Sequence, residues 1–99
     1  MYYKLDENKN VVQCTLKEWC DYTEGRTNQS KHVGDNNIDG KRISTIFLGL
    51  PYGYYENAPL YVFETIVFDD GSSIYEKRYS TWKEADEGHQ RAIEWVRDG

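Results

Sequence analysis

Most of the architecture is specified by one continuous stretch, Leu60–Val96, which reads LYVFETIVFDDGSSIYEKRYSTWKEADEGHQRAIEWV. Its first nine residues are dense in β-branched and aromatic side chains, which favour a strand. The segment Asp69-Asp-Gly-Ser72 is typical of a turn, because Gly71 adopts a positive φ without steric cost. The alternating residues Ser73–Tyr79 predict a returning partner strand, so we expect a β-hairpin here.

A helix is predicted directly after this hairpin. The segment Thr81-Trp-Lys-Glu84 is a capping box, in which the Thr81 hydroxyl accepts from the Glu84 amide and the Glu84 side chain reaches back. The residues that follow repeat apolar side chains at the 3.6-residue spacing of an α-helix. The members of that stripe are Trp82, Ala85, His89, Ala92, Ile93 and Val96. His89 is its ionisable member, and the main site hypothesis starts from it.

The segments before residue 60 predict the remaining elements. Tyr2–Leu5 and Val11–Cys14 flank a polar turn and predict short strands. Thr15-Leu-Lys-Glu18 is a second capping box and opens a short helix. Arg26–Lys41 is polar and irregular, so we expect a mobile loop there. Arg42–Leu50 predicts an inner strand, because both of its faces carry apolar residues.

Together these elements predict a single α+β domain over residues 1–99, with the element order β(β)αβββα. Three or four antiparallel strands form the sheet, two helices accompany it, and the C-terminal helix packs on one face. A chain of 99 residues has room for one modest core and is too short for two.

The composition is that of an acidic protein rich in aromatic residues, which make up 15% of the chain. Seventeen Asp and Glu against twelve Lys and Arg give a net charge of −5. This balance argues against direct binding of nucleic acid and permits a basic protein partner. No stretch resembles a signal peptide or a membrane span, so we expect a cytoplasmic protein with no membrane partner.

The residues that commonly hold metals are spaced unsuitably. Cys14 and Cys20 lie six apart, and we expect reduced thiols there, since only His32 and His89 could complete a zinc site. The segment Asp35–Gly40 matches the first half of a calcium-binding loop, but the twelfth position is Ile46, where a glutamate is needed. A tight turn at Asp39-Gly40 is the better interpretation, and we expect no metal and no cofactor.

One site hypothesis is a pocket formed by Glu64, Thr65, Arg78 and His89. A glutamate is unusual within such a strand, and it is either a carboxylate held in a cleft or the partner of Arg78 or Lys77 in a cross-strand ion pair. His89 follows Gly88, whose place in a helix suggests a close approach. His89 is either a core histidine bonded to Thr45 or Thr65, or it meets Glu64 and Arg78 under the sheet.

A second site hypothesis is a contact surface on two loops. The loop Pro51–Pro59 carries Tyr52, Tyr54 and Tyr55, which either tuck under the sheet or contact a partner. The acidic residues Asp35 and Asp39 belong to the same surface hypothesis. We name no catalytic residues and expect a protein that is not an enzyme, because the sequence holds no nucleophile motif and no phosphate-binding loop.

Three segments resemble a widespread family of small, uncharacterised bacteriophage proteins. The segments are Ile43-Ser-Thr-Ile-Phe-Leu-Gly-Leu50, Pro59-Leu-Tyr-Val-Phe-Glu-Thr-Ile-Val-Phe68 and Arg78-Tyr-Ser-Thr-Trp-Lys-Glu-Ala-Asp-Glu-Gly-His89. The helix with Leu16-Lys-Glu-Trp19 is similar too, and the likeness covers about half of the chain. The resemblance implies a phage origin and marks Glu64, Thr65, Arg78, Gly88 and His89 as motif positions.

Three functions follow as expectations. The first is a non-enzymatic phage accessory protein that binds and blocks a host protein, such as a nuclease or another nucleic-acid-binding defence component. The second is a protein that sequesters a small nucleotide-like ligand, with Arg78 and His89 on the anion and the tyrosines on the base. The third is a structural protein of phage assembly that works as a homo-oligomer.

Overall fold

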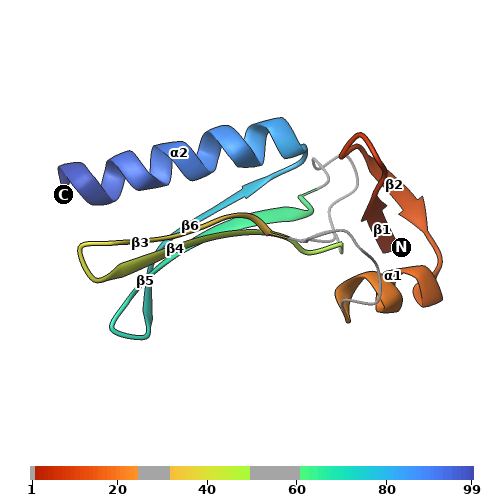
Figure 1. Ribbon diagram of the computed structural model, residues 1–99, viewed down its shortest axis with the longest axis horizontal. Coiled ribbons are helices and arrows are strands. Elements are labelled where there is room, and N and C mark those ends of the chain that lie inside the picture. Colours follow the sequence, from red (N-terminus) through yellow and green to blue (C-terminus); the bar gives the residue numbers. More distant parts are fainter. Residues whose placement is uncertain (1, 25–31, 50–60) are drawn as a thin grey trace.

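Four strands form an antiparallel sheet in the order in which they follow one another along the chain (Figure 1). They are β3 (His32–Ile38), β4 (Lys41–Phe47), β5 (Phe63–Asp69) and β6 (Ser72–Tyr79). The computed structural model describes residues 2–24, 32–49 and 61–99. Within that part of the chain, the expected α+β fold and its four-stranded antiparallel sheet are confirmed.

Both tight turns of this sheet are built by an Asp-Gly pair. Asp39 and Gly40 have φ values of 52° and 79°, and Asp70 and Gly71 have φ values of 52° and 80°. Two-residue hairpin turns with positive φ at both positions match the twist of the flanking strands, and Asp-Gly is a favoured pair for them. The turns predicted at these two places are confirmed.

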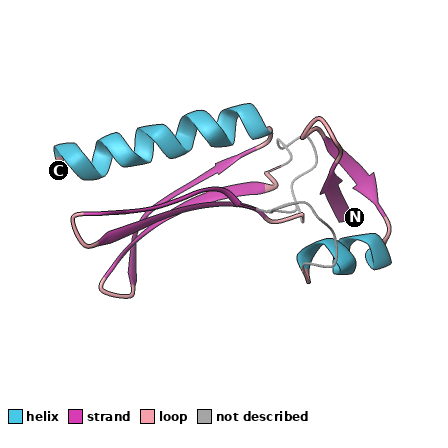
Figure 2. Cartoon of the chain, in the orientation of Figure 1, coloured by secondary structure: helices cyan, strands magenta, loops and turns pink. Residues whose placement is uncertain are grey.

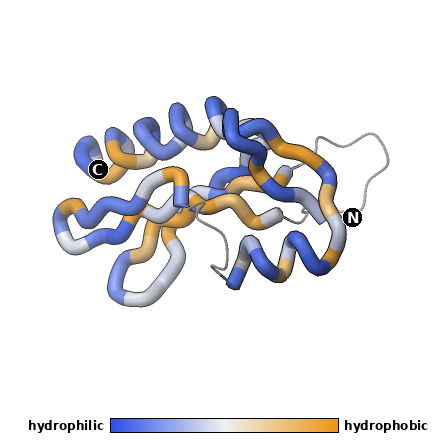
Figure 3. Tube along the Cα trace, turned by 45° about the vertical axis from the view of Figure 1, so that its right-hand side comes forward, coloured by the Kyte–Doolittle hydropathy of each residue, from blue (hydrophilic) through white to orange (hydrophobic). Residues whose placement is uncertain are grey.

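The helix α2 (Trp82–Asp98) lies along one face of the sheet and gives the domain two layers (Figure 2). We call this side of the sheet the helix face. Its strand residues alternate along the chain and are buried: Ile43, Thr45, Phe47, Phe63, Thr65 and Val67. The buried residues of α2 are Ala85, Gly88, His89, Ala92, Ile93 and Val96. Hydrophilic residues predominate along the rest of α2 (Figure 3).

The N-terminal hairpin and the short helix extend the core at one end of the sheet. The hairpin pairs β1 (Tyr2–Leu5) with β2 (Val11–Cys14), and α1 (Leu16–Thr23) follows it. Tyr22 of α1 packs edge-on against Phe47, with ring centroids 5.6 Å apart. Trp19 donates its indole N–H to the Leu48 carbonyl at 3.3 Å. These contacts attach a helix that is too short to be stable alone.

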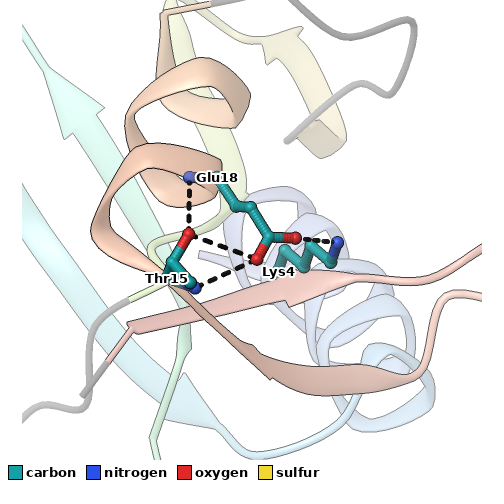
Figure 4. Close-up of polar contacts among 3 residues, drawn as sticks. All are labelled: Lys4, Thr15 and Glu18. Atoms are coloured by element: carbon teal, nitrogen blue, oxygen red, sulfur yellow. Dashed lines mark hydrogen bonds and ion pairs between the residues drawn. The ribbon is translucent and has the colours of Figure 1, made fainter.

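The capping box predicted for α1 is present (Figure 4). The Glu18 amide donates to the Thr15 hydroxyl, and the Thr15 amide donates to the Glu18 carboxylate, both at 3.2 Å. Lys4 of β1 forms an ion pair with the same carboxylate. At the start of α2, the Thr81 hydroxyl accepts from the Glu84 amide at 3.1 Å, as predicted. Each helix therefore begins where its cap predicted.

The expectation of an irregular stretch over residues 26–41 is wrong for its second half. His32–Ile38 is the strand β3, which pairs with β4, and Lys41 already belongs to β4. The segment Gly34-Asp-Asn-Asn37 has low strand propensity, but pairing across the Asp39-Gly40 turn outweighs that preference. Residues 25–31 lie outside the described part of the chain.

Neither helix in the described part of the chain combines the length and the apolar character that a membrane crossing requires.

Candidate functional site

The most distinctive feature of the helix face is a buried chain of polar side chains centred on His89. The His89 side chain enters the core from α2, and the residue is only 2% exposed. Its Nδ1 lies 2.7 Å from the Thr45 hydroxyl, and its Nε2 lies 2.7 Å from the Asn36 side-chain oxygen. Thr45 is in turn bonded to the Thr65 hydroxyl of the next strand. The chain thus joins α2 to β3, β4 and β5.

The partners of the imidazole fix its protonation in this arrangement. The Asn36 oxygen can only accept, so Nε2 carries the hydrogen and Nδ1 accepts from Thr45. Because the Thr45 hydroxyl donates its one hydrogen to His89, the Thr65 hydroxyl donates to the Thr45 oxygen. Burial lowers the pKa of His89, and the carboxylates of Asp86 and Asp35 raise it to a smaller extent. The site therefore favours a neutral histidine whose two nitrogens are both satisfied.

Two glycines make room for the aromatic rings beside this chain. A Cβ on Gly34 of β3 would lie 2.5 Å from the His89 Nε2 atom, so the imidazole packs directly on the strand backbone. A Cβ on Gly88 would lie 2.2 Å from the ring of Tyr79 on β6. The sequence predicted that some group approaches the helix closely at Gly88, and this group is the ring of Tyr79.

Tyr79 brings an unpaired hydroxyl next to the polar chain. Among the described side chains, its oxygen is the buried polar atom that has no hydrogen-bond partner. Burial raises the pKa of Tyr79, and the neighbouring Thr65 hydroxyl lowers it to a smaller extent without meeting hydrogen-bond geometry. An unpaired buried hydroxyl costs free energy, so the Tyr79 end of the chain is its weakest point.

The structure does not bring the four residues of the pocket hypothesis together. Glu64 and Thr65 are adjacent in β5, so their side chains point to opposite faces of the sheet. Thr65 is buried on the helix face with His89, whereas Glu64 pairs across the strands with Arg78 on the other side. The arrangement in which His89 meets Glu64 and Arg78 is wrong, and the interpretation as a core histidine bonded to Thr45 is confirmed.

The face opposite α2, which we call the second face, carries ion pairs instead of a buried chain. Arg78 donates to Glu64 at 3.0 Å and lies 3.7 Å from Glu76. Nearer the other edge, Arg42 donates two hydrogen bonds to Asp35, at 2.9 and 3.2 Å. The expected cross-strand pair of Glu64 and Arg78 is therefore present.

The residues of the surface hypothesis are placed separately. Asp35 is held by Arg42, and this hydrogen bond lowers the pKa of the Asp35 carboxyl. Asp39 lies exposed in the β3–β4 turn. Tyr52, Tyr54 and Tyr55 lie outside the described residues.

Sequence reasoning missed Asn36 and Gly34, which complete the surroundings of His89. The available signal was Gly34, because a glycine within a strand often marks a place where another group approaches the backbone closely. Asn36, two residues further on, lies on the same face of the strand. The low strand propensity of this segment concealed that signal.

Other reactive groups are dispersed. In the described part of the chain, no three His, Cys, Asp or Glu side chains gather in a way that could hold a metal ion. Cys14 and Cys20 are half-buried thiols that are not joined in a disulfide, and burial raises the pKa of Cys14. A raised pKa disfavours the reactive thiolate form of Cys14.

The fold and the site together define a small two-layer α+β protein whose polar chain is buried at His89, Thr45 and Thr65 and reaches an exposed residue at Asn36. No protein-family model, curated protein or solved structure matches the chain.

Proposed function

We propose that the protein is a non-enzymatic bacteriophage accessory protein that binds a host protein and blocks it. The proposed partner is a nucleic-acid-binding component of host defence, such as a nuclease. Such a protein would act in the host cytoplasm. The sequence resemblance supports the phage origin, and the exposed side of α2 supports the mode of action.

The exposed side of α2 is predominantly acidic, and this observation carries the proposal. Its carboxylates are Glu84, Asp86, Glu87, Glu94 and Asp98, against the cations Lys83, Arg91 and Arg97, and all eight residues are exposed. The spacing of Glu84, Glu87, Glu94 and Asp98 puts these four carboxylates on one side of the helix, where Arg91 is the one cation between Glu87 and Glu94. A row of negative charges can occupy a basic groove that otherwise holds phosphates.

The earlier acidic candidates lie outside the exposed side of α2, because Asp35 belongs to β3 and Asp39 to the β3–β4 turn. Asp39 is exposed at a turn, so reversal of its charge is expected to weaken binding of a basic partner. Asp35 is already paired with Arg42, so reversal of its charge would also break an internal ion pair. The stability of an Asp35 variant must therefore be measured beside its binding.

The test is capture of partners from a bacterial host lysate on the immobilised protein, followed by competition. We expect a nucleic-acid-binding protein that is released both by salt and by duplex DNA, because the ligands share one groove. The triple variant Glu84→Gln, Glu87→Gln, Glu94→Gln should lose capture. The matched control, Asp69→Asn, Asp70→Asn, Glu76→Gln, removes three charges from the β5–β6 hairpin and should keep capture.

Salt-insensitive capture, or equal capture by both triple variants, would contradict the mechanism. Capture that persists when duplex DNA is in excess would show that the partner's nucleic-acid groove is not the contact.

A second candidate function, a structural homo-oligomer, is favoured by one observation on the second face. Ile46, Ile66 and Phe68 are only half-buried there, and no described helix lies over them (Figure 1). Light scattering distinguishes the candidates, since Phe68→Asp should dissociate such an oligomer and leave capture by α2 intact.

A further inference from the structure

Two cavities near the start of α2 share a wall formed by Lys9 and Trp82. The Lys9 ammonium lies 4.3 Å from the centroid of the Trp82 ring, which is a cation–π contact. The smaller cavity has a volume of about 330 Å³ and the larger one about 520 Å³. Volumes of about 300–1,000 Å³ are typical of small-molecule sites. Neither cavity is lined by His89 or by a carboxylate of α2, although Lys83 on the exposed side of α2 borders the larger one.

The smaller cavity, which we call the apolar cavity, combines four aromatic or aliphatic residues with the titratable residues Asp6, Glu7, Lys9 and His32. Leu5 and Tyr22 are buried residues that border it, and Val33 and Trp82 are half-buried. Asp6 also borders it, but the Asp6 carboxylate accepts from the amides of the β1–β2 turn. A lining of this kind suits a planar ring, which buries a large area against aromatic side chains at low entropic cost.

The larger cavity, which we call the polar cavity, combines cations with neutral hydrogen-bonding groups. It is lined by Asn8, Asn10, Ser80, Thr81 and Lys83 in addition to the shared wall and Val11. Two lysines and no carboxylate belong to this lining, although the chain as a whole has a charge of −5. Two carboxylates contact residues of this lining: Glu84 accepts from the Thr81 hydroxyl at 3.0 Å, and Asp6 accepts from the amides of Asn8 and Asn10 at 2.9 Å. This local excess of cations favours an anionic group.

Lys9 itself holds a strained backbone conformation. Its φ is 64°, a region that residues other than glycine, asparagine and aspartate rarely adopt. Such strain costs on the order of 1–3 kcal/mol and often occurs at binding sites. A glycine at this position would relieve the backbone strain. The side chain of Lys9 borders both cavities, and a role there would explain why a lysine occupies the position.

We propose that the two cavities form one site for a mononucleotide. The base lies against Trp82 in the apolar cavity, and the phosphate lies in the polar cavity between the ammonium groups of Lys9 and Lys83. Base stacking on an aromatic ring supplies affinity for any base, and the two cations select the phosphorylated form. This site does not require the proposed blocking function, and Glu84 is the carboxylate of that function that contacts a residue of the site, Thr81.

The test compares three probes on the full chain by calorimetric titration: AMP, adenosine and inorganic phosphate. We expect AMP to bind saturably and at least about tenfold more tightly than either adenosine or phosphate, because only AMP fills both cavities. The variant Lys83→Gln should reduce AMP binding to the level of adenosine and leave adenosine unchanged. The matched control Lys77→Gln, an exposed lysine on β6, should change neither.

A second variant, Lys9→Gly, separates binding from folding. Glycine adopts a positive φ freely, so this variant should be as stable as the parent or more stable, while its AMP affinity falls at least about fivefold. Absence of saturable AMP binding at about 10 mM would overturn the proposal. AMP binding that Lys9→Gly and Lys83→Gln leave unchanged would overturn it equally. Neither result bears on capture of a host protein by α2.

Discussion

The two faces of the four-stranded sheet use polar residues in opposite ways. On the helix face, Thr45 and Thr65 are fully buried and His89 is 2% exposed. On the second face, the side chains of Glu64 and Arg78 are 12% and 30% exposed, and those of Asp35 and Arg42 are 39% and 51% exposed. The same strands therefore present a largely buried neutral network on one side and water-accessible charges on the other.

This difference teaches where polar groups determine stability. A buried donor or acceptor that loses its partner keeps the full cost of leaving water, about 1–3 kcal/mol. An exposed ion pair loses little when it is broken, since water and salt replace the partner. The helix face should consequently be intolerant of change, and the second face should be free to change with function.

The largest effect is expected for His89→Ala. The substitution removes a buried ring and leaves the Thr45 hydroxyl without its acceptor, so the free energy of unfolding should fall by about 3–4 kcal/mol. Urea denaturation followed by circular dichroism measures this loss. On the second face, Glu64→Ala should cost less than about 1 kcal/mol. Comparable losses in the two variants would remove the distinction between the faces.

The second-largest effect is expected at Gly88, where substitution by alanine should lower the stability of the fold instead of raising it. In an ordinary helix interior, glycine to alanine raises stability by about 1 kcal/mol. Here the new Cβ would lie 2.2 Å from the buried ring of Tyr79, so Gly88→Ala should destabilise the fold by about 1–3 kcal/mol. Thermal denaturation measures the change, and Gln90→Ala on the exposed side of α2 is the control. A stabilised Gly88→Ala protein would mean that the Tyr79 ring is not fixed against α2.

The third prediction concerns pH and again separates the faces. Burial lowers the pKa of His89 below its ordinary value of 6.5, so the unfolded chain binds a proton more readily than the folded one. Stability is then complete above this ordinary value and falls as the pH drops through it. Denaturation midpoints between about pH 5 and 7 test this slope, which His89→Gln should flatten. The ion pair of Asp35 makes stability depend on pH in a lower pH range, because Arg42 lowers the pKa of the Asp35 carboxyl.

Local signals in the sequence predicted much of this structure, and nonlocal pairing decided the rest. The two Asp-Gly turns and the caps at Thr15 and Thr81 could be read from short patterns. The helical stripe indicated a core position for His89 and left Thr45 and Thr65 as alternative partners, of which the structure has Thr45. The strand β3 could not be read in this way, because its residues have low strand propensity and its pairing with β4 determines its structure.

The pocket hypothesis, in which Glu64 meets His89, is wrong for a different reason. Both faces of β5 are apolar, with Thr65 and Val67 on one side and Ile66 and Phe68 on the other. The sequence therefore did not determine which face α2 covers, and it left open whether Glu64 lies with His89 or only pairs with Arg78. Packing selected the face that carries Thr65, where the histidine gains a buried partner.

The smallest effect is expected for the pair Glu64 and Arg78. A double-mutant cycle with Glu64→Gln and Arg78→Gln should give a coupling of less than about 1 kcal/mol, because Arg78 is partly exposed and also lies near Glu76. The coupling should weaken as sodium chloride is raised to about 1 M, since salt screens charges that water can reach. The loss caused by Thr45→Val, a change in the neutral buried chain, should not depend on salt. A salt-independent coupling above about 2 kcal/mol would place the Glu64–Arg78 pair in the same energetic class as the buried network.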